Sequence, residues 1–286
     1  MKIAIITGGT GPERNTSINS AKYIQSNITF AESETFLYPE DYPVFLEQVN
    51  DIDVVIPMVH GYGGEDGTIQ KDLEQKGIKY IFSKPDVHAL CFDKEQAKVK
   101  VAELVYLTPQ TYADKVKFPC IAKPQSSGSS DGLFFINSED ELEFLPKNTN
   151  FILEEFIQGR ELTVGVVEHE GEEMVLPVME VLKPSKLFTR EEKYSDTAGD
   201  IEVFLPREDH TLEKRIQNIA LDIHKNLGVR HLSRSDFIVT DDGEVYFLEI
   251  NTTPGCTETS FIPKMIEKAG LSFSELLEYW CLQEIK

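Results

Sequence analysis

The chain has 286 residues, of which 41% are hydrophobic and 27% are charged, a composition typical of globular proteins. Acidic residues outnumber basic ones by 49 to 28, and the formal net charge of −21 argues against non-specific binding to nucleic acid or to anionic membrane surfaces. No apolar run approaches the roughly 20 residues of a membrane-spanning helix, and the apolar start of the chain is expected to be a buried strand rather than a secretory signal.

Two apolar, β-branched segments near the N-terminus predict buried strands, Lys2–Ile6 and Asp53–Val59. Each runs into a segment rich in glycine, Gly8-Gly9 after the first strand and Gly61 to Gly64 after the second. A helix is predicted to begin near Pro12, because proline suits the first helical position. A strand, a glycine loop and a helix in succession are typical of a parallel sheet that binds ligands at its carboxyl edge.

Strand and helix patterns alternate along the rest of the chain, which predicts an α/β fold. A boundary at Lys84-Pro85 gives predicted domains at residues 1–84, 85–158 and 159–286, and a helical stretch follows the boundary through Glu103. The later strands are expected at Pro119–Pro124, Gly132–Ile136, Phe151–Ile157, Leu162–Glu168, Met174–Leu182, Ile201–Leu205, Asp236–Thr240 and Glu244–Asn251.

Two further helices are marked by local signals. Apolar residues from Leu212 to Leu227 form one helical stripe, which predicts a helix over Thr211–Leu227. Ser272 and Glu275 form a capping box that opens the last helix. Residues 183–200 are polar without either period and predict a long loop of the kind that often forms a lid.

The four cysteines are far apart and form no C-x-x-C pair. Their spacing therefore predicts neither a zinc site nor a redox motif, and so few cysteines fit a reducing compartment such as the cytosol.

The most informative segment is a predicted hairpin around Asp242-Gly243, a strong two-residue turn signal. With that turn, Asp236 faces Glu249 and Arg234 faces Asn251, so all four polar side chains lie on one face of the sheet. Carboxylate and amide oxygens without histidine or cysteine suit a hard cation such as Mg²⁺, with an arginine beside it for phosphate charge. The alternative is a surface strand pair with ordinary exposed charges.

Two other segments suggest a nucleotide site. Lys123 ends a strand and enters a glycine- and serine-rich loop, whose N–H groups and hydroxyls could hold phosphate although G-x-x-x-x-G-K-[ST] is absent. The strand and turn at Asn150–Glu161 could offer backbone groups to adenine and an acid to ribose. Read alone, the first segment fits a flexible hairpin equally well, and the second fits a strand with exposed acids better. His60 alone is more often structural than catalytic.

Two motifs together are highly specific: His-Gly-x-x-Gly-Glu-Asp-Gly from His60, and Glu-Ile-Asn-x-x-Pro-Gly-x-Thr-x-x-Ser from Glu249. With the segments above, in the same order across almost the whole chain, they resemble the D-alanine–D-alanine ligases of the ATP-grasp superfamily. The resemblance implies a parallel N-terminal α/β domain and two α+β domains that sandwich ATP. It also implies two bound Mg²⁺ ions, with Mn²⁺ as an alternative, and a homodimer.

The resemblance assigns roles to single residues. The implied ATP contacts are Lys94, Lys123, Ser130, Glu154, Phe156, Ile157, Glu161 and Leu248, and the implied metal ligands are Asp236, Glu249 and Asn251. The implied catalytic residues are Glu13, Ser129, Lys193, Tyr194, Arg234 and Gly255, and the implied substrate-binding residues are His60 and Ser260. Asp131 and the segment Phe188-Thr189-Arg190 depart from the family pattern.

The activity implied is ATP-dependent joining of two D-alanine molecules through an acyl phosphate, for peptidoglycan precursors in the cytoplasm. A ligase that takes D-lactate, D-serine or another amino acid as second substrate stays open, although Lys193-Tyr194 favours D-alanine by resemblance. From a different class, a nucleotide-binding protein without catalysis is the remaining alternative.

Overall fold

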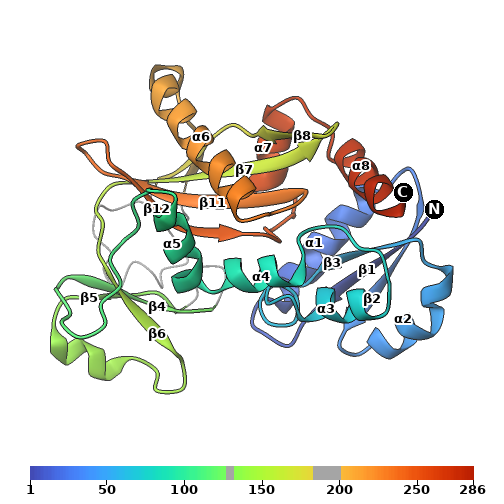
Figure 1. Ribbon diagram of the computed structural model, residues 1–286, viewed down its shortest axis with the longest axis horizontal. Coiled ribbons are helices and arrows are strands. Elements are labelled where there is room, and N and C mark those ends of the chain that lie inside the picture. The colour runs from blue at the N-terminus through green and yellow to red at the C-terminus, as the bar shows by residue number, and fades with distance from the viewer. Residues whose placement is uncertain (127–131, 183–200) are drawn as a thin grey trace.

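The computed structural model describes residues 1–126, 132–182 and 201–286, so the predicted lid at 183–200 lies outside the described residues. One β-sheet lies within each of the predicted ranges 1–84, 85–158 and 159–286. Figure 1 shows the large sheet of the last range above the other two, with the small sheet on the left and the N-terminal sheet on the right. The exact domain boundaries stay a prediction.

The N-terminal sheet is parallel, with strand order β2-β1-β3. Its strands are β1 (Lys2–Gly8), β2 (Glu32–Tyr38) and β3 (Val54–Met58), and its helices are α1 (Arg14–Asn27), α2 (Tyr42–Gln48) and α3 (Thr68–Gln75). Alternate residues of β1 enter two different cores, Ile3 and Ile5 on one face and Ala4 and Ile6 on the other. Both predicted strands are confirmed. Their continuous apolar runs are explained by burial on both faces of the sheet.

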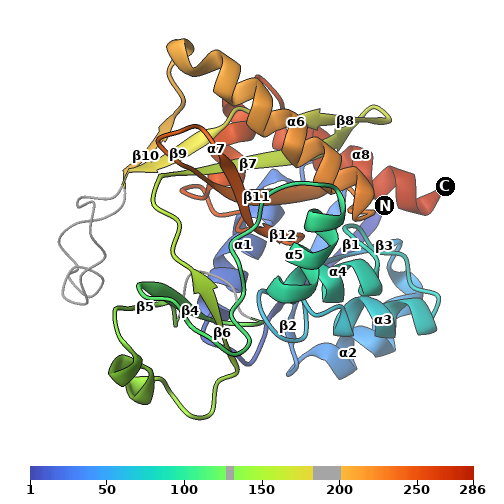
Figure 2. The same ribbon diagram turned by 60° about the vertical axis from the view of Figure 1, so that its left-hand side comes forward.

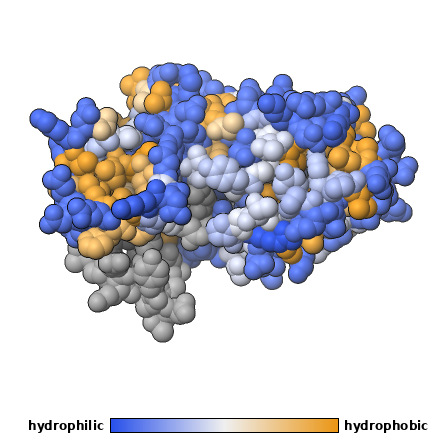
Figure 3. Space-filling model, turned by 90° about the horizontal axis from the view of Figure 1, so that it is seen from below, coloured by the Kyte–Doolittle hydropathy of each residue, from blue (hydrophilic) through white to orange (hydrophobic). Residues whose placement is uncertain are grey.

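The small sheet is antiparallel, with order β5-β4-β6, and consists of β4 (Cys120–Pro124), β5 (Phe134–Ile136) and β6 (Phe151–Glu155). Its thin core surrounds three buried residues, Cys120, Ala122 and Ile136. Seen from below, much of the molecule is hydrophilic, while apolar residues gather on the left, where this sheet lies (Figure 3).

Two helices precede the small sheet, α4 (Pro85–Phe92) and α5 (Lys94–Glu103), and both pack against the last strand of the large sheet. The prediction of one continuous helical stretch is wrong at Asp93. This residue has an extended backbone, and its carboxylate accepts hydrogen bonds from the N–H groups of Glu95 and Gln96, so it caps a new helix.

The large sheet has the order β10-β9-β7-β11-β12, with β8 paired to β7. Its strands are β7 (Arg160–His169), β8 (Glu172–Val175), β9 (Met179–Leu182), β10 (Ile201–Phe204), β11 (Leu232–Val239) and β12 (Val245–Asn251). The single strand expected at Met174–Leu182 is two strands in the structure. Pro177 lies between them, and its missing N–H cannot continue a ladder.

Alternate residues of β7 bury the two faces of the large sheet against different helices. Val164 and Val166 pack under α6 (His210–Asn226), which lies across one face in Figures 1 and 2. On the other face, a Cβ at Gly165 would lie 2.7 Å from the Ile262 Cδ1 atom of α7 (Phe261–Lys268), so glycine at this position allows the helix to pack closely against the strand. The helix predicted from the stripe in Thr211–Leu227 is confirmed as α6.

The last helix, α8 (Phe273–Ile285), joins the N-terminal sheet to the large sheet. Its Trp280 is fully buried in the same core as Ile3 and donates a hydrogen bond from Nε1 to the Glu168 carbonyl oxygen at 2.7 Å. Ser272 caps the helix as predicted, since its hydroxyl oxygen accepts from the Glu275 N–H at 3.3 Å. Short 3-10 helices lie at Val49–Asp51, Glu139–Phe144 and Arg207–Asp209.

None of the helices in the described ranges combines the length and apolar character that a membrane span requires. The four cysteines are all buried free thiols, and burial raises the pKa of Cys91, Cys120, Cys256 and Cys281. No cysteine is therefore poised as a nucleophile.

Candidate active site

Charged and polar side chains converge where the large sheet meets the N-terminal sheet and the start of α5. On β11, buried residues alternate with partly exposed ones, and Arg234 and Asp236 lie on the face opposite α6. Thr163 of β7 pairs directly with Asp236, and Glu161 lies two residues before it on the same face. The site is therefore built on the sheet face that is turned toward the N-terminal part of the chain.

The predicted facing pairs are confirmed: Asp236 faces Glu249 and Arg234 faces Asn251. The reason differs from the prediction. The turn has three residues rather than two, because Thr240 and Glu244 close it with a hydrogen bond of 3.0 Å between the Thr240 N–H and the Glu244 carbonyl oxygen. A register shift between Asp236 and Phe237 restores the pairing, since Phe237 faces Phe247 and Leu248 becomes an extra residue in β12.

Ion pairs hold both hairpin carboxylates. Arg234 donates to Asp236 through two nitrogens, from Nε to Oδ1 at 3.1 Å and from Nη2 to Oδ2 at 3.0 Å, and the Thr163 hydroxyl donates to Asp236 Oδ1 at 2.5 Å. Lys94 Nζ lies 3.3 Å from Glu249 Oε2. Burial raises the pKa of Glu249, but Lys94, Lys123 and Arg234 outweigh it and hold the pKa below its usual range. Glu249 is therefore ionised at neutral pH.

The donor set fits a hard divalent cation. Asp236 and Glu249 offer carboxylate oxygens from facing positions, and the Asn251 side-chain oxygen is oriented by a hydrogen bond of 2.8 Å from the Thr253 N–H. Within the described ranges, no three His, Cys, Asp or Glu side chains gather into a cage of their own. Two carboxylates and one amide suit Mg²⁺, which fills its remaining positions with water and phosphate oxygens.

The His60 side chain is buried at the end of β3. Its Nε2 lies 3.3 Å from the Ser20 hydroxyl, and its backbone N–H donates to the Ser17 hydroxyl at 2.9 Å. Burial, together with the positive charge of Arg234, lowers the pKa of His60 to about 4 despite a hydrogen bond with the Thr253 backbone. The imidazole is therefore neutral at pH 7 and acts through hydrogen bonds rather than charge.

Two acidic side chains surround the loop after His60. A Cβ at Gly61 would lie 3.4 Å from Glu13 Oε2, so this carboxylate approaches the loop closely. The Gly61 N–H donates to Glu65 Oε2 at 2.7 Å. Burial raises the pKa of Glu65 to about 7, with contributions from Glu13 and Glu249 that the Gly61 N–H and Lys94 only partly offset.

Gly64 in this loop leaves no room for a side chain, because an added Cβ would lie 1.9 Å from the Val59 carbonyl oxygen. We expect Gly64→Ala to destabilise the protein by about 2 kcal/mol or more, which corresponds to a melting temperature lower by roughly 5 °C. Thermal unfolding measures the shift. The matched control is Gly11→Ala, because a Cβ there meets nothing within 4 Å. Equal melting temperatures for both variants would contradict the clash.

The segment that follows β12 brings Gly255 against Ser260. A Cβ at Gly255 would lie 3.1 Å from the Ser260 hydroxyl oxygen, and this hydroxyl accepts from the Thr257 N–H at 3.1 Å. Ser260 directly precedes α7, and its backbone carbonyl oxygen accepts a hydrogen bond from the first turn of this helix. Gly255 and the Ser260 hydroxyl therefore lie side by side in the segment that follows the hairpin.

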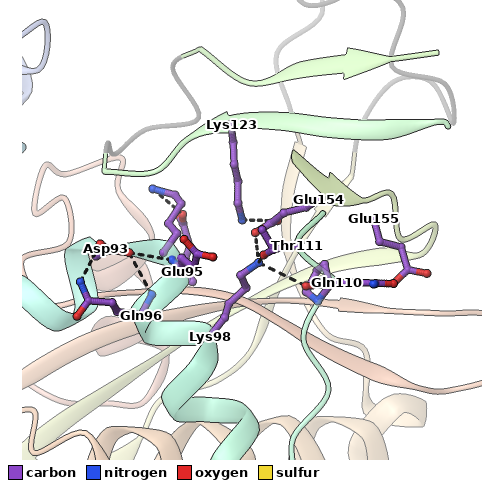
Figure 4. Close-up of polar contacts among 12 residues, drawn as sticks. Asp93, Glu95, Gln96, Lys98, Gln110, Thr111, Lys123, Glu154 and Glu155 are labelled. Carbon is purple, nitrogen blue, oxygen red and sulfur yellow. Dashed lines mark hydrogen bonds and ion pairs between the residues drawn. The ribbon is translucent and has the colours of Figure 1, made fainter. Parts of the chain in front are cut away.

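Four of the predicted nucleotide residues, Lys123, Glu154, Phe156 and Ile157, lie in or directly after the strands of the small sheet, whereas Lys94, Glu161 and Leu248 lie on α5, β7 and β12. Lys123 Nζ lies 2.8 Å from Glu154 Oε2, and Glu154 is only 3% exposed (Figure 4). Phe156 packs edge-on against Phe135 at 4.9 Å between ring centroids, and Ile157 is buried. The predicted residues Ser129, Ser130, Lys193 and Tyr194, and the departures at Asp131 and Phe188-Thr189-Arg190, lie outside the described residues.

A pocket lies beside the hairpin strand β12. It is lined by Glu65, Phe92, Lys94, Glu249 and Asn251, among others. A larger hollow of about 670 Å³ lies between residues 105–107 and α6, and none of the predicted site residues lines it. We place the site at the pocket beside Glu249, because ionisable groups from three parts of the chain converge there.

Comparison with known proteins decides the family. The family model described as "D-ala D-ala ligase C-terminus" matches residues 90–280. A D-alanine–D-alanine ligase of Thermotoga sp. (strain RQ2) is 34% identical, over 97% of this chain and 95% of the relative. The chain belongs to the D-alanine–D-alanine ligase family.

Solved structures agree with membership of the D-alanine–D-alanine ligase family. A ligase of this name from Bacillus anthracis, complexed with ATP, superposes with a TM-score of 0.82 at 28% identity, covering 100% of this chain and 98% of that one. VanG, a D-Ala:D-Ser ligase from Enterococcus faecalis, gives 0.81 at 28% identity, with 100% and 99% covered. The predicted ATP-grasp fold of the family is confirmed.

Three residues near this site were not identified by the sequence analysis. Glu65 stands within the His60 motif, and Thr163 is the strand partner of Asp236. Lys98 forms an ion pair with Glu154 and lies one helical turn after Lys94. The motif and the i, i+4 spacing were available signals for Glu65 and Lys98, whereas Thr163 required the pairing of β7 with β11.

Proposed function

We propose that this protein joins two D-alanine molecules into D-alanyl-D-alanine at the expense of ATP, for peptidoglycan precursor synthesis. The observation that carries the proposal is the hairpin that sets the Arg234–Asp236 ion pair beside Glu249, in a chain aligned with D-alanine–D-alanine ligases over 97% of its length.

The chemistry begins with a carboxylate, which is a poor acyl donor at neutral pH. Its oxygen attacks the ATP γ-phosphorus, the bond from phosphorus to the bridging oxygen breaks, and ADP leaves an acyl phosphate. The neutral amine of the second amino acid attacks the acyl carbon and a tetrahedral intermediate forms. The nitrogen gives up a proton, the bond from the acyl carbon to the phosphate oxygen breaks, and inorganic phosphate leaves with that oxygen and its electron pair. Magnesium held at Asp236, Glu249 and Asn251 would neutralise charge on the phosphates when bound.

The first amino acid would bind between the N-terminal loops. Glu13 offers a negative charge to the ammonium group of this amino acid. The neutral His60 can donate a hydrogen bond to its carboxylate without neutralising the carboxylate charge. A neutral donor orients this carboxylate while leaving its oxygen free to attack phosphorus. Lys94 and Lys123, which pair with Glu249 and Glu154, would face the phosphates.

Acyl transfer would use the other side of the site. Arg234 and the Gly255 N–H would stabilise the oxyanion of the tetrahedral intermediate, and Ser260 would bind the carboxylate of the second amino acid. For adenosine, we propose Glu154, Phe156, Ile157 and Leu248 around adenine and Glu161 at the ribose. Ser129, Ser130, Lys193 and Tyr194 keep the roles that the family resemblance implies, at the phosphates and in closing the site against water.

The second substrate has one specific competitor. The likeness to a D-Ala:D-Ser ligase at 28% identity keeps D-serine open, and D-lactate and other amino acids follow the same mechanism. The Lys193-Tyr194 pair favours D-alanine by resemblance. A nucleotide-binding protein without catalysis is disfavoured, because a protein that only bound ATP would not need an arginine that pairs with a carboxylate and acts electrostatically on a buried histidine.

The test is phosphate release from ATP and Mg²⁺ with products identified by mass. The arms are D-alanine alone, D-alanine with D-serine, D-alanine with D-lactate, and L-alanine. We expect release with D-alanine alone and the mass of the dipeptide. Release only with a mixed pair would move the second substrate, and no release with any arm would overturn the proposed ligase activity.

The setting of the enzyme is also a proposal. The family resemblance implies a cytoplasmic homodimer that handles small amino acids and has neither nucleic-acid nor membrane partners. Light scattering coupled to gel filtration would report the mass of the assembly, and a monomer would contradict the dimer without touching the proposed chemistry.

A further inference from the structure

Glu154 of β6 is shared by two buried lysines. Its Oε1 forms an ion pair with Lys98 Nζ, and its Oε2 lies 2.8 Å from Lys123 Nζ. Glu154 is 3% exposed, Lys98 is 3% exposed and Lys123 is 7% exposed, so all three groups have lost most of their water. Figure 4 shows the two ammonium groups meeting the carboxylate from opposite elements, β4 above and α5 below.

The two lysines differ in what else they contact. Lys98 also donates to the Thr111 hydroxyl at 2.7 Å and to the Pro109 carbonyl oxygen at 3.4 Å. An ammonium group has three donors, so Glu154, Thr111 and Pro109 account for all of them. Among the described residues, the only ion-pair partner of Lys123 is Glu154, and Lys123 stands just before the serine- and glycine-rich loop proposed to meet phosphate.

Helix α5 carries Lys98 to this place. Lys94 and Lys98 are one turn apart and share a face of the helix. Lys94 reaches Glu249 on the large sheet, and Lys98 reaches Glu154 on the small sheet. Because α5 packs against β12, Lys98 fixes the small sheet to the element that also holds the metal-site carboxylate.

We propose that Lys98 is a positioning residue for the nucleotide: it stays the counter-ion of Glu154 and thereby releases Lys123 to bind ATP phosphate. The proposal rests on the proposed function, which assigns Glu154 and Lys123 to ATP.

The physical reason is the cost of an unpaired buried charge. If Lys123 turns toward phosphate, Glu154 loses one of its two cations while remaining buried. With Lys98 in place the carboxylate keeps a full ion pair, and the charge of Lys123 becomes available to the nucleotide. Without Lys98, binding ATP would strand Glu154 without a cation, or Lys123 would stay where it is. Burial lowers the pKa of Lys98, partly offset by Glu154, as expected for a lysine enclosed on every side.

A purely structural Lys98 predicts a different outcome. It would change thermal stability and leave the affinity of the folded protein for nucleotide unaltered. The proposal instead predicts a selective effect on nucleotide affinity, because the group that Lys98 releases meets the nucleotide directly.

The experiment measures the KM for ATP, kcat, and the dissociation constant of Mg·ADP by calorimetry. We expect Lys98→Met to raise the KM and the dissociation constant about tenfold, the loss of one charge-assisted hydrogen bond, with kcat within about threefold. Lys98→Arg should restore most of the affinity. The matched control is Lys100→Met on the same helix, whose exposed pair with Glu103 should leave every value unchanged.

A double variant separates the explanations and guards against misfolding. In Lys98→Met/Glu154→Gln no buried carboxylate is stranded, so the variant should fold, and losing Lys98 should cost less than about twofold relative to Glu154→Gln alone. An equal cost in both backgrounds, or an unchanged Mg·ADP affinity in Lys98→Met, would overturn the proposal. Mg·ADP binding does not depend on which amino acids are joined, so failure of the proposed ligase reaction would be seen separately.

Discussion

Glu249→Gln is expected to lower the rate of ligation by about a thousandfold or more, because it removes one of two facing carboxylates from the proposed metal and phosphate site. The substitution keeps the size of the side chain and takes away only its charge and one acceptor. Lys94 and Arg234 then lose the negative charge that they share. Dipeptide formation at saturating ATP and Mg²⁺ measures the effect, and circular dichroism checks that the fold is retained.

The matched control for Glu249→Gln is Glu244→Gln. Glu244 lies at the turn of the same hairpin with an exposed side chain, and its described hydrogen bonds use its backbone atoms. The control should keep wild-type activity. If Glu249→Gln also ligated at a rate near wild type in Mg²⁺, the metal role of the hairpin would be wrong.

The hairpin shows how far local sequence reasoning reaches. The facing of Asp236 with Glu249 was predicted from a two-residue turn, yet the structure has a three-residue turn and an extra residue at Leu248. The turn is one residue longer than predicted and β12 contains one extra residue. These two differences cancel at Arg234 and Asp236, but Phe237 faces Phe247 instead of Leu248. Alternation keeps polar residues on one face whatever the turn, but the turn and the bulge that fix a register are decided by packing on both neighbours.

Elements with a strong apolar period were predictable, and elements without one were not. The run in β1 and the stripe in α6 carry their own burial pattern. Strand β2, with the sequence ESETFLY, is an edge strand in which only Phe36 is buried, so it shows no clear alternation. The break between α4 and α5 depends on a capping bond from Asp93, which also contacts Gln125 from outside the helices.

The ionic part of the site was hardest to foresee. The resemblance named Glu154 and Lys123, but the register that brings them together depends on β4 pairing with β6, where Glu154 faces Ile121 and shares its side of the sheet with Lys123. Lys98 enters from a third element that packs on another sheet. Contacts between separate sheets depend on how whole layers pack, and no spacing within one segment reports that.

Arg234→Met is expected to lower kcat by about a hundredfold to a thousandfold, because it removes the cation proposed to hold the oxyanion. Arg234→Lys should recover only part of the rate. A lysine keeps the charge but cannot copy the fork by which Arg234 donates to both oxygens of Asp236. Steady-state kinetics measure the effect, and Arg215→Met on the exposed side of α6 is the matched control. Rates within about threefold of wild type for both Arg234 variants would contradict the oxyanion role.

The same substitution gives a second, independent readout at His60. The positive charge of Arg234 contributes, after burial, to lowering the pKa of this imidazole to about 4. Removing the charge should raise the pKa toward its ordinary value, while burial keeps it below that value. As pH falls below about 6.5, the unfolded chain takes up a proton at this histidine while the folded protein does not, so the folded protein loses stability until the pH reaches the folded-state pKa. A higher folded-state pKa narrows this range, so His60 should cost Arg234→Met less stability at acid pH than it costs wild type. NMR titration of the His60 ring in the folded variant would show the shift. An unchanged pKa would mean that the charge of Arg234 does not act on His60. The proposed oxyanion site at Arg234 and the proposed first-substrate site at His60 would then be electrostatically independent.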